Sequence, residues 1–503
     1  MDRLFGIETE YGIVVDGLSA VDWVSESMAV VRGHAGEAVK GWNYRGEDAR
    51  RDMRGFTVKS LNTNPDDAVF DTGSHHTMSH EEERSDRILV NGARFYNDHG
   101  HPEYATPECR NLFDLVAHDR AGERVVLDAA KRRSAAIGRA VTIYKNNTDF
   151  HGSSYGTHEG YLMQRHVDTT ALIGTLLPFF ASRCVYAGAG KAGVENVSGP
   201  DADRFQLSQR ADFMAVEASV DTLHNRPLVN TRDEPHATPS KYRRLHVICG
   251  DANMSEVATA LKVGATVLVL RLLEDGWTSP VRLRDPVRAS RNISRDLSFK
   301  LAYEQDGGTS LRAIDIQRAY LVAAEHRYAG ADAETDWVLH EWRTALDLLE
   351  TDFTKLADRL DWVAKYLLLD EFRQEEGLPW NDSHIQSLDL AYHNIDRSEG
   401  LYYGLEEAGA MRRLVTESRV DAAVSCAPAD TRAYLRGLII KRFGHAVKRT
   451  GWNGIVFHHN GEDLLFDMNP LVEENARILN EEFASAQTLD EVVNLIRRNG
   501  QQN

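Results

Sequence analysis

The stretch that decides the fold is residues 91–108, NGARFYNDHGHPEYATPE. It follows an apolar run at residues 88–90, which predicts a strand entering the core. Along an extended chain, Arg94, Tyr96 and Asp98 lie on one face because side chains alternate. An unpaired buried charge is costly, so this concentration of acids and imidazoles indicates a metal, a polyanionic ligand or acid–base chemistry. The alternative is a polar hairpin with ordinary surface pairs.

A second pair of acids, Glu8 and Glu10, lies near the start of the chain in GIETEYG. Carboxylates two residues apart on a strand share a face and repel each other unless a cation lies between them. Hard carboxylate oxygens of this kind suit Mg²⁺. Glu-x-Glu alone is a weak signal, but together with Asp98 and Glu103 it favours a metal site.

Imidazoles and guanidinium groups extend this set. His158 and His246 are candidate metal ligands in strand-like contexts, although a lone histidine is more often structural. Three arginines in polar clusters suit phosphate, which guanidinium binds bidentately, and the alternative is salt bridges to nearby acids: Arg232, Arg243 and Arg244. Metal ligands together with arginines predict a nucleoside triphosphate site.

The bulk composition limits the class of protein. The chain has 503 residues, of which 42% are hydrophobic and 27% charged, as in globular proteins with a large core. No apolar run is long enough for a membrane span, and the N-terminus lacks the apolar core of a signal peptide. Four cysteines without metal-type spacing indicate reduced thiols, so we expect a cytoplasmic protein. A net charge of −18 argues against nucleic-acid binding.

The pattern of elements predicts a large α+β domain, residues 1–426, and a small C-terminal domain, residues 427–503. A strand is expected at residues 4–15, and helices dominate from about 255 to 396. Residues 40–87 are rich in Asn, Asp, Ser and His with few apolar anchors, so we expect a mobile insertion over the surface. A solvated loop is favoured over metal binding for its histidines His75, His76 and His80.

These motifs resemble a known family. They are GIETEYG, NGARFYNDHGHPEYATPEC, HDRAGE, YKNNTD, LSQRAD, NTRDEPHA, KYRRLHVICGDANMSE and DLAYHNI. Together they cover nearly the whole chain and are similar to the Pup ligase and deamidase family, relatives of glutamine synthetase. The resemblance implies a glutamine synthetase-like large domain with a curved, mainly antiparallel sheet flanked by helices.

Two features favour the deamidase/depupylase branch over the ligase branch. About 75 residues separate the first strand from NGAR, and Asp98 and Glu103 are five residues apart. Other motifs are ligase-like, including GIETEYG, HPEYAT and DLAYHNI. The resemblance therefore implies an ATP- and Mg²⁺-dependent amidase that deamidates the C-terminal glutamine of Pup and cleaves the Pup–lysine isopeptide bond. The alternatives are a Pup–protein ligase and a non-catalytic nucleotide-binding regulator.

The resemblance also implies roles for individual residues. Asp98 is the catalytic aspartate, acting as nucleophile or as base for water. The expected Mg²⁺ ligands, with Glu10 as a helper, are Glu8, Glu10, Tyr96, Glu103, His158 and His246. The positions expected near ATP are Arg94, Thr106, Arg244 and Trp452. One departure is Gly160, where the family normally has Asn, so a side chain near ATP is missing.

The expected partners are Pup and pupylated proteins, with no nucleic acid and no membrane, and the protein is expected to be a monomer. Pup is small, acidic and mostly disordered, so an acidic enzyme needs a local basic groove to bind it. Basic residues in or just after a predicted helix at 431–443 are candidates for one edge of that groove: Arg432, Arg436, Lys441, Arg442, Lys448 and Arg449.

Overall fold

A computed structural model describes residues 3–18, 22–44, 47–61, 78–195, 197, 199–472 and 476–500. Its central element is a seven-stranded sheet in which every neighbouring pair is antiparallel. In spatial order the strands are β13 (Tyr242–Val247), β8 (Thr157–Gln164), β1 (Phe5–Glu10), β6 (His101–Ala105), β5 (Arg94–Asp98), β4 (Arg87–Leu89) and β3 (Ala38–Val39). The predicted α+β class with a mainly antiparallel sheet is confirmed.

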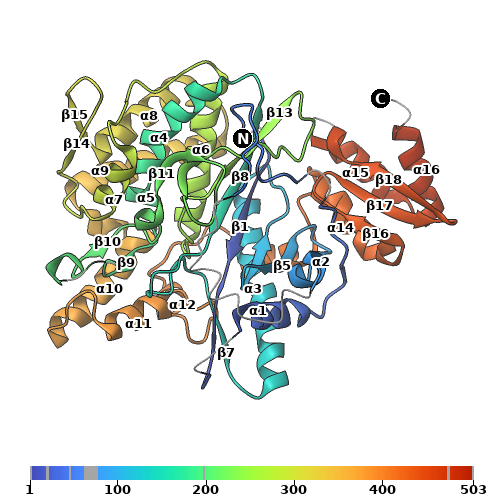
Figure 1. Cartoon of the computed structure of the whole chain (residues 1–503), viewed down its shortest axis with the longest axis horizontal. Coiled ribbons are helices and arrows are strands. Elements are labelled where there is room, and N and C mark those ends of the chain that lie inside the picture. Colours follow the sequence, from blue (N-terminus) through green and yellow to red (C-terminus); the bar gives the residue numbers. More distant parts are fainter. Residues whose placement is uncertain are drawn as a thin grey trace.

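Helices surround this sheet, and α4 to α9 gather on one side of β8 and β13 (Figure 1). No described helix is long and apolar enough to cross a membrane. The helices up to residue 425 are α1 (Trp23–Arg32), α2 (His80–Arg84), α3 (Leu112–Ile137), α4 (Thr169–Ser182), α5 (Cys184–Ala187), α6 (Glu256–Glu274), α7 (Pro286–Ser294), α8 (Ala313–Tyr328), α9 (Ala333–Thr351), α10 (Asp361–Glu376), α11 (Ser383–Tyr392), α12 (Leu401–Glu407) and α13 (Glu417–Ser425).

Capping residues explain where the long helices α3 and α6 begin and where α3 ends. The Asn111 side chain accepts hydrogen bonds from two backbone amides of the first turn of α3, and Gly138 ends that helix with a φ of 66°. Ser255 caps α6 in the same way, and α6 is buried along almost its whole length. The apolar surface of α6 therefore forms the centre of the main hydrophobic core.

The predicted strand at residues 4–15 is two strands, which is a correction. β1 ends at Glu10, and β2 (Gly12–Val15) pairs with β7 (Val141–Tyr144) in a separate sheet. Between them, the Tyr11 amide donates to the carbonyl of Pro102. The remaining two-stranded sheets are β9 (Lys191–Ala192) with β10 (Phe205–Gln206), β11 (Val216–Ser219) with β12 (Pro227–Asn230), and β14 (Ala302–Glu304) with β15 (Ser310–Arg312).

Some described residues of the predicted insertion, residues 40–87, are buried in the protein, whereas others, such as Phe56, are exposed. Trp42 is buried among C-terminal apolar side chains, and Met53 belongs to the main core. The stretch 62–77, with His75 and His76, lies outside the described residues. Mobility of the insertion stays a prediction, and it does not extend to Trp42 and Met53, whose side chains are buried.

The C-terminal elements form a three-stranded sheet with three helices, visible at the right of Figure 1. They are α14 (Arg432–Phe443), β16 (Val447–Thr450), β17 (Gly454–His459), β18 (Glu462–Asp467), α15 (Ala476–Ser485) and α16 (Leu489–Gly500). Their hydrophobic cluster also includes Val39 and Ile88 from the edge of the large sheet and Trp42, which follows β3. The domain boundary near residue 427 stays a proposal, because one hydrophobic cluster contains residues from both sides of it.

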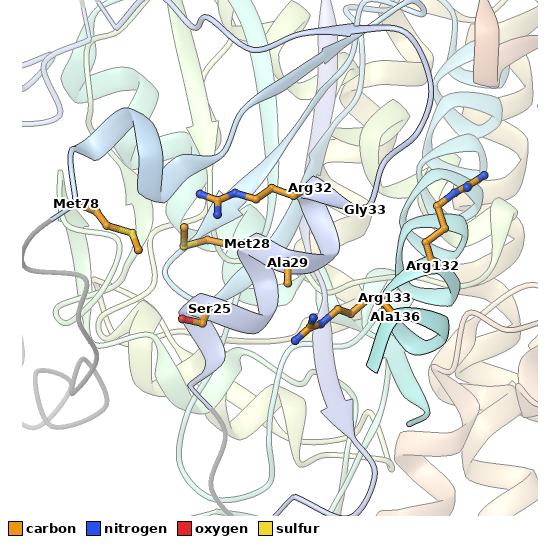
Figure 2. Close-up of a pocket in the computed structure, with 9 residues that line it drawn as sticks. All are labelled: Ser25, Met28, Ala29, Arg32, Gly33, Met78, Arg132, Arg133 and Ala136. Carbon is orange, nitrogen blue, oxygen red and sulfur yellow. The ribbon is translucent and has the colours of Figure 1, made fainter. Parts of the chain in front are cut away.

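A cavity of about 460 Å³ lies between α1 and the end of α3 (Figure 2). Two of its lining arginines are paired with acids, because Arg133 contacts Glu26 at 2.7 Å and Arg132 contacts Asp128 at 3.0 Å. The third, Arg32, donates to the Ser85 hydroxyl at 3.0 Å. No residue predicted to be functional lines it. This cavity is therefore not the candidate site, whose predicted metal ligands lie on the large sheet.

A buried ion cluster joins the two parts of the molecule. Glu108 accepts from the Arg432 Nε at 2.8 Å and also pairs with Arg436, which donates to the carbonyl of Gly92 at 2.8 Å. Burial opposes ionisation of Glu108, but the two guanidinium groups lower its pKa to about 2. Glu108 therefore anchors α14 to the start of α3.

We expect Glu108→Gln to lower the free energy of unfolding by about 3 kcal/mol at neutral pH, because two buried guanidinium groups lose their counter-charge. The folded pKa lies below the ordinary value of 4.5, so the stabilisation is complete above pH 4.5 and is lost as the pH falls toward about 2. Urea unfolding at neutral and acidic pH measures both effects. Glu482→Gln, which removes an exposed pair with Arg498, is the control with little expected change. Equal effects of the two substitutions would contradict this role of Glu108.

Candidate active site

The hairpin of β5 and β6 brings the residues of the deciding stretch together. Its two-residue turn, His99-Gly100, has positive φ at both positions, 47° and 88°, as a type I′ turn requires. This turn sets the register that places Tyr96 opposite Glu103. In β1 the register places Glu10 opposite Glu103 on one side and Glu8 opposite His158 on the other. A shift of one residue would turn all of these side chains to the other face.

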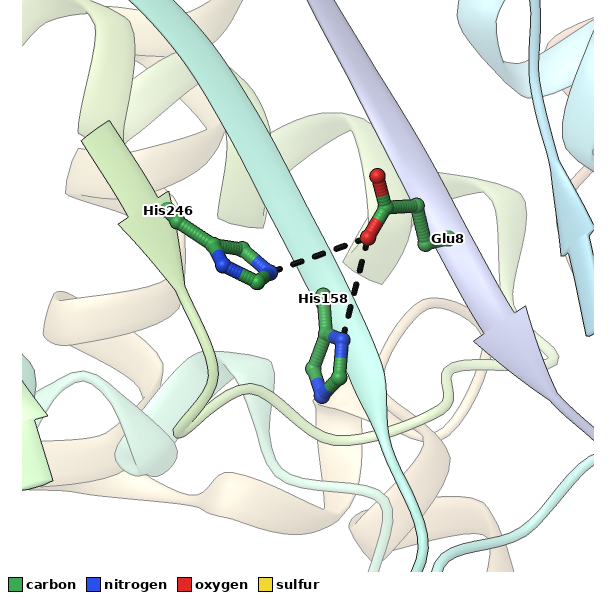
Figure 3. Close-up of side chains that lie close together, drawn as sticks. All are labelled: Glu8, His158 and His246. Atoms are coloured by element: carbon green, nitrogen blue, oxygen red, sulfur yellow. Dashed lines mark ion pairs between the residues drawn. The ribbon is translucent and has the colours of Figure 1, made fainter. Parts of the chain in front are cut away.

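The first potential metal-binding group is Glu8, His158 and His246, whose ligand atoms lie within 4.8 Å of one another. Figure 3 shows the three side chains pointing toward one another from β1, β8 and β13. The Glu8 Oε2 lies 3.8 Å from the His158 Nδ1 and 3.6 Å from the His246 Nε2. The structure therefore brings together three predicted residues that come from separate segments of the sequence.

The electrostatics of this group suit a cation. Burial opposes ionisation of Glu8, but the contact with His158 and the charge of Arg244 hold the pKa of its carboxyl below the usual value. Burial and the charge of Arg244 lower the pKa of His246, so its ring is neutral. Both ring nitrogens of His246 are buried without a hydrogen-bond partner among the described residues. An orphaned neutral imidazole beside a carboxylate fits a divalent metal ion.

The second potential metal-binding group is Glu10, Asp98 and Glu103, again within 4.8 Å. The backbone amide of Gly156 donates to Glu10 at 2.6 Å, and the Tyr96 hydroxyl donates to Glu103. Burial and the charges of Asp98 and Glu10 raise the pKa of Glu103 well above its usual value. The Glu103 Oε2 has no partner among the described residues, so this crowded carboxylate group also fits a bound cation.

Asp98 contacts one arginine and one histidine. Arg84 of α2 pairs with its Oδ1, and the His99 Nδ1 lies 2.7 Å from the same oxygen. Burial opposes ionisation of Asp98, but the charges of Arg84 and His99 hold its pKa well below the usual value. Asp98 is therefore ionised and has the charge that a nucleophile or a general base needs.

A cavity of about 80 Å³ lies beside the first metal-binding group. Glu8, Thr106, Arg244 and Trp452 line it, which brings together three of the four residues predicted near ATP. Gly160 is opposite Gly6 in the sheet, and both line the cavity, so this part of its wall carries no side chains.

Arg94, the fourth predicted nucleotide residue, does not line this cavity. Its guanidinium pairs with Asp86 at 2.8 Å and lies 3.9 Å from the ring centre of Tyr96 and 4.1 Å from that of Trp42. Burial opposes its charge, but the charge of Asp86 holds its pKa above the usual value. The structure therefore places Arg94 behind Tyr96, where it packs against one of the predicted metal ligands.

The other arginines are divided in the same way. Arg232 donates to the carbonyl of Val220, and Arg243 donates to Thr169, so neither lines the cavity that Arg244 lines. Arg432 and Arg436 are buried on Glu108 and are not available to an acidic partner, which corrects their assignment to a basic groove. Of that set, the residues that remain at least partly exposed are Lys441, Arg442, Lys448 and Arg449.

Two residues of the site were missed: Arg84 contacts Asp98, and His236 lines the cavity. Arg432, which was expected at a basic groove, lines the cavity as well. His236 adopts a φ of 48°, which is uncommon outside glycine and clusters at functional sites. The motif NTRDEPHA marked His236 as part of a polar cluster, whereas Arg84 lay in a segment whose composition indicated a loop.

We expect His246→Ala to weaken Mn²⁺ binding at least about tenfold, the loss that even an outer-shell substitution typically causes. The reason is that the substitution removes a neutral imidazole whose nitrogens have no hydrogen-bond partner among the described residues and are therefore available to a metal ion. Electron paramagnetic resonance of free Mn²⁺ measures the affinity. His166→Ala is the matched control, because that ring is exposed and lies 3.3 Å from the carbonyl of Glu274. An unchanged affinity in His246→Ala would exclude His246 as a ligand.

Comparison with known proteins identifies the family. The family model described as Pup-ligase protein matches residues 3–456. The depupylase of Acidothermus cellulolyticus is 42% identical over 481 residues, covering 92% of this chain and 93% of the relative. The Pup deamidase/depupylase of Mycolicibacterium smegmatis is also 42% identical, over 477 residues and the same shares of both chains. The Pup–protein ligase of Acidimicrobium ferrooxidans is 42% identical over 406 residues, covering 78% of this chain and 88% of the relative.

Solved structures agree with this result. The ligase PafA in complex with Pup superposes with a TM-score of 0.77 at 31% identity, covering 98% of this chain and 95% of that chain. PafA in complex with ADP gives 0.72 at 32% identity, covering 85% and 96%. The extent of these matches shows that this chain belongs to the Pup-ligase family, which includes relatives named as Pup ligases and as Pup deamidases/depupylases.

Proposed function

We propose that this chain is an ATP- and Mg²⁺-dependent amidase that deamidates the C-terminal glutamine of Pup and cleaves the Pup–lysine isopeptide bond. The observation that carries the proposal is the position of Asp98. This ionised carboxylate lies in one group with Glu10 and Glu103, on the same sheet as the group of Glu8, His158 and His246.

The choice between amidase and ligase rests on the length of the matches. Relatives named depupylase or deamidase/depupylase match 92% of this chain, whereas two relatives named Pup–protein ligase match 78% and 71% at similar identity. The fold does not distinguish the two activities, because PafA has it as well. The spacing of Asp98 and Glu103 also supports the amidase.

The cavity beside Glu8 supports nucleotide binding. Thr106 offers a hydroxyl, Arg244 a guanidinium and Trp452 an aromatic ring, and each suits a different part of ATP. The related PafA has been solved with ADP, which supports a nucleotide site in this family. The proposed Mg²⁺ ligands are Glu8, Glu10, Tyr96, Glu103, His158 and His246. When bound, Mg²⁺ supplies positive charge that stabilises negative charge developing in the reaction.

The chain's own residues explain why an amide is attacked. An amide is a poor electrophile, so the reaction needs a strong nucleophile or an activated water. Asp98 is ionised and lies at the end of β5, next to the His99-Gly100 turn. It therefore acts either as the nucleophile toward the amide carbon or as the base for a water molecule.

The partner follows from the same proposal. PafA has been solved with Pup, and an acidic partner of this kind suits the exposed basic residues that follow α14. Lys448 lies there and pairs with Asp463, and Arg449 pairs with Glu81. The carboxylates of an acidic peptide can take the place of Asp463 and Glu81 in these pairs. We propose a monomeric, cytoplasmic enzyme, and its four cysteines are free thiols, as a reducing compartment requires.

We expect Asp98→Asn to abolish deamidation of glutamine-ended Pup while ATP still binds, because the amide has neither the charge of a nucleophile nor the basicity of a proton acceptor. Mass spectrometry of Pup measures the reaction, and equilibrium binding of a fluorescent ATP analogue measures the site. Asp128→Asn is the control, since Asp128 is exposed on α3 and pairs with Arg132.

Three results would contradict the proposal. A near-normal rate in Asp98→Asn would exclude the catalytic assignment. Transfer of glutamate-ended Pup to a lysine by the unaltered protein, without deamidation, would indicate a ligase. Nucleotide binding without either reaction would indicate a regulator, for which the glycine at position 160 is the motivating feature.

A further inference from the structure

Two donors from different elements meet on one oxygen of Asp98. Arg84 reaches the Oδ1 from α2, and the His99 Nδ1 reaches it at 2.7 Å from the turn after β5. The Asp98 side chain is 18% exposed and that of Arg84 22%, so solvent screens the pair only in part. The guanidinium also lies 5.7 Å from the ring centre of Tyr96.

The short helix α2 is held firmly enough to place Arg84. Ser79 and Glu82 form a reciprocal capping box at its start. The Asn97 amide donates to the carbonyl of Glu83 at 3.1 Å, which ties α2 to β5 itself. Arg32 of α1 donates to the Ser85 hydroxyl at 3.0 Å. Contacts to two separate elements therefore fix the position of the Arg84 backbone.

The second donor is held by backbone geometry. His99 has a φ of 47° in the two-residue turn, and this geometry directs its ring back to the preceding carboxylate. The turn is fixed by the pairing of Asp98 with His101 and by a hydrogen bond from the Gly100 amide to Asn97. Both donors are therefore in place before any substrate binds.

Asp98 needs such support because of its neighbours. Glu10 and Glu103 lie in the same group within 4.8 Å, and this crowding disfavours a second negative charge beside Asp98. A carboxylate held by no donor would turn away from the other two acids. Two donors on the Oδ1 hold that oxygen in place and so resist such a movement of the side chain.

We propose that Arg84 and His99 form a clamp that positions the Asp98 carboxylate for reaction with the amide of the substrate. The clamp acts through Asp98, so Arg84 and His99 are positioning residues. The inference rests on the proposed function, in which Asp98 is the catalytic group. Because α2 follows residues 40–79, the segment before NGAR would then contribute directly to the geometry of the catalytic centre.

The test uses the full-length protein with ATP, saturating Mg²⁺ and glutamine-ended Pup. Arg84→Gln is expected to lower kcat roughly 10- to 100-fold, as a misplaced catalytic group does, with little change in the KM for Pup or in ATP affinity. Arg84→Lys should restore part of kcat because it keeps the charge. Guanidinium added to Arg84→Gly should restore activity, which a purely structural role would not allow. His99→Gly keeps the positive φ and should also lower kcat.

Arg87→Gln is the matched control. Its guanidinium lies in the same segment and donates to the backbone carbonyls of Ser85 and Asp86, away from Asp98. Thermal unfolding of every variant separates loss of positioning from loss of structure. An unchanged kcat in Arg84→Gln, or an equal fall in Arg87→Gln, would overturn the clamp. If Asp98→Asn is inactive while Arg84→Gln is fully active, only the clamp fails, whereas activity in Asp98→Asn would remove the proposed function itself.

Discussion

The crowding of acidic side chains on one sheet face is the constraint on which the rest of the site depends. Glu8 and Glu10 share a face of β1, and the neighbouring strands add Asp98 and Glu103 to it. Such a face is stable only with positive charge beside it. The protein supplies Arg84 and His99 to Asp98 and Arg244 to Glu8, and it leaves two groups whose geometry and orphaned atoms fit metal ions.

The same constraint explains how the distant parts of the chain serve one site. The packed flanks of residues 40–87 carry Arg84 to Asp98, so this segment is more than a surface addition. At the other side of the cavity, Glu108 holds Arg432 and Arg436 of α14. That pairing places Trp452 at the cavity wall, so the C-terminal elements complete a site whose metal-binding groups belong to the large sheet.

Much of the site could be predicted because strand periodicity and residue chemistry are local. Alternation alone placed Glu8 with Glu10 and Tyr96 with Asp98, and the motifs then grouped them with His158 and His246. Register, turn conformation and long-range pairing were not predictable. Arg84 sits in HEEER, a sequence whose charges look solvated, and only the fold brings it to Asp98. Arg432 and Arg436 look like a basic surface, yet their partner Glu108 lies more than three hundred residues earlier. The predicted single strand at residues 4–15 divides after Glu10 because β2 pairs with β7 in another sheet.

The most direct test of the account is the position of a metal ion on this face. Crystals soaked in Mn²⁺ and ADP give anomalous peaks wherever manganese binds. The account predicts peaks within bonding distance of Glu8 and His246 and of Glu10 and Glu103, with nucleotide density beside Arg244 and Trp452. Manganese bound only elsewhere, with these carboxylates still paired to the protein's own arginines and histidines, would contradict it.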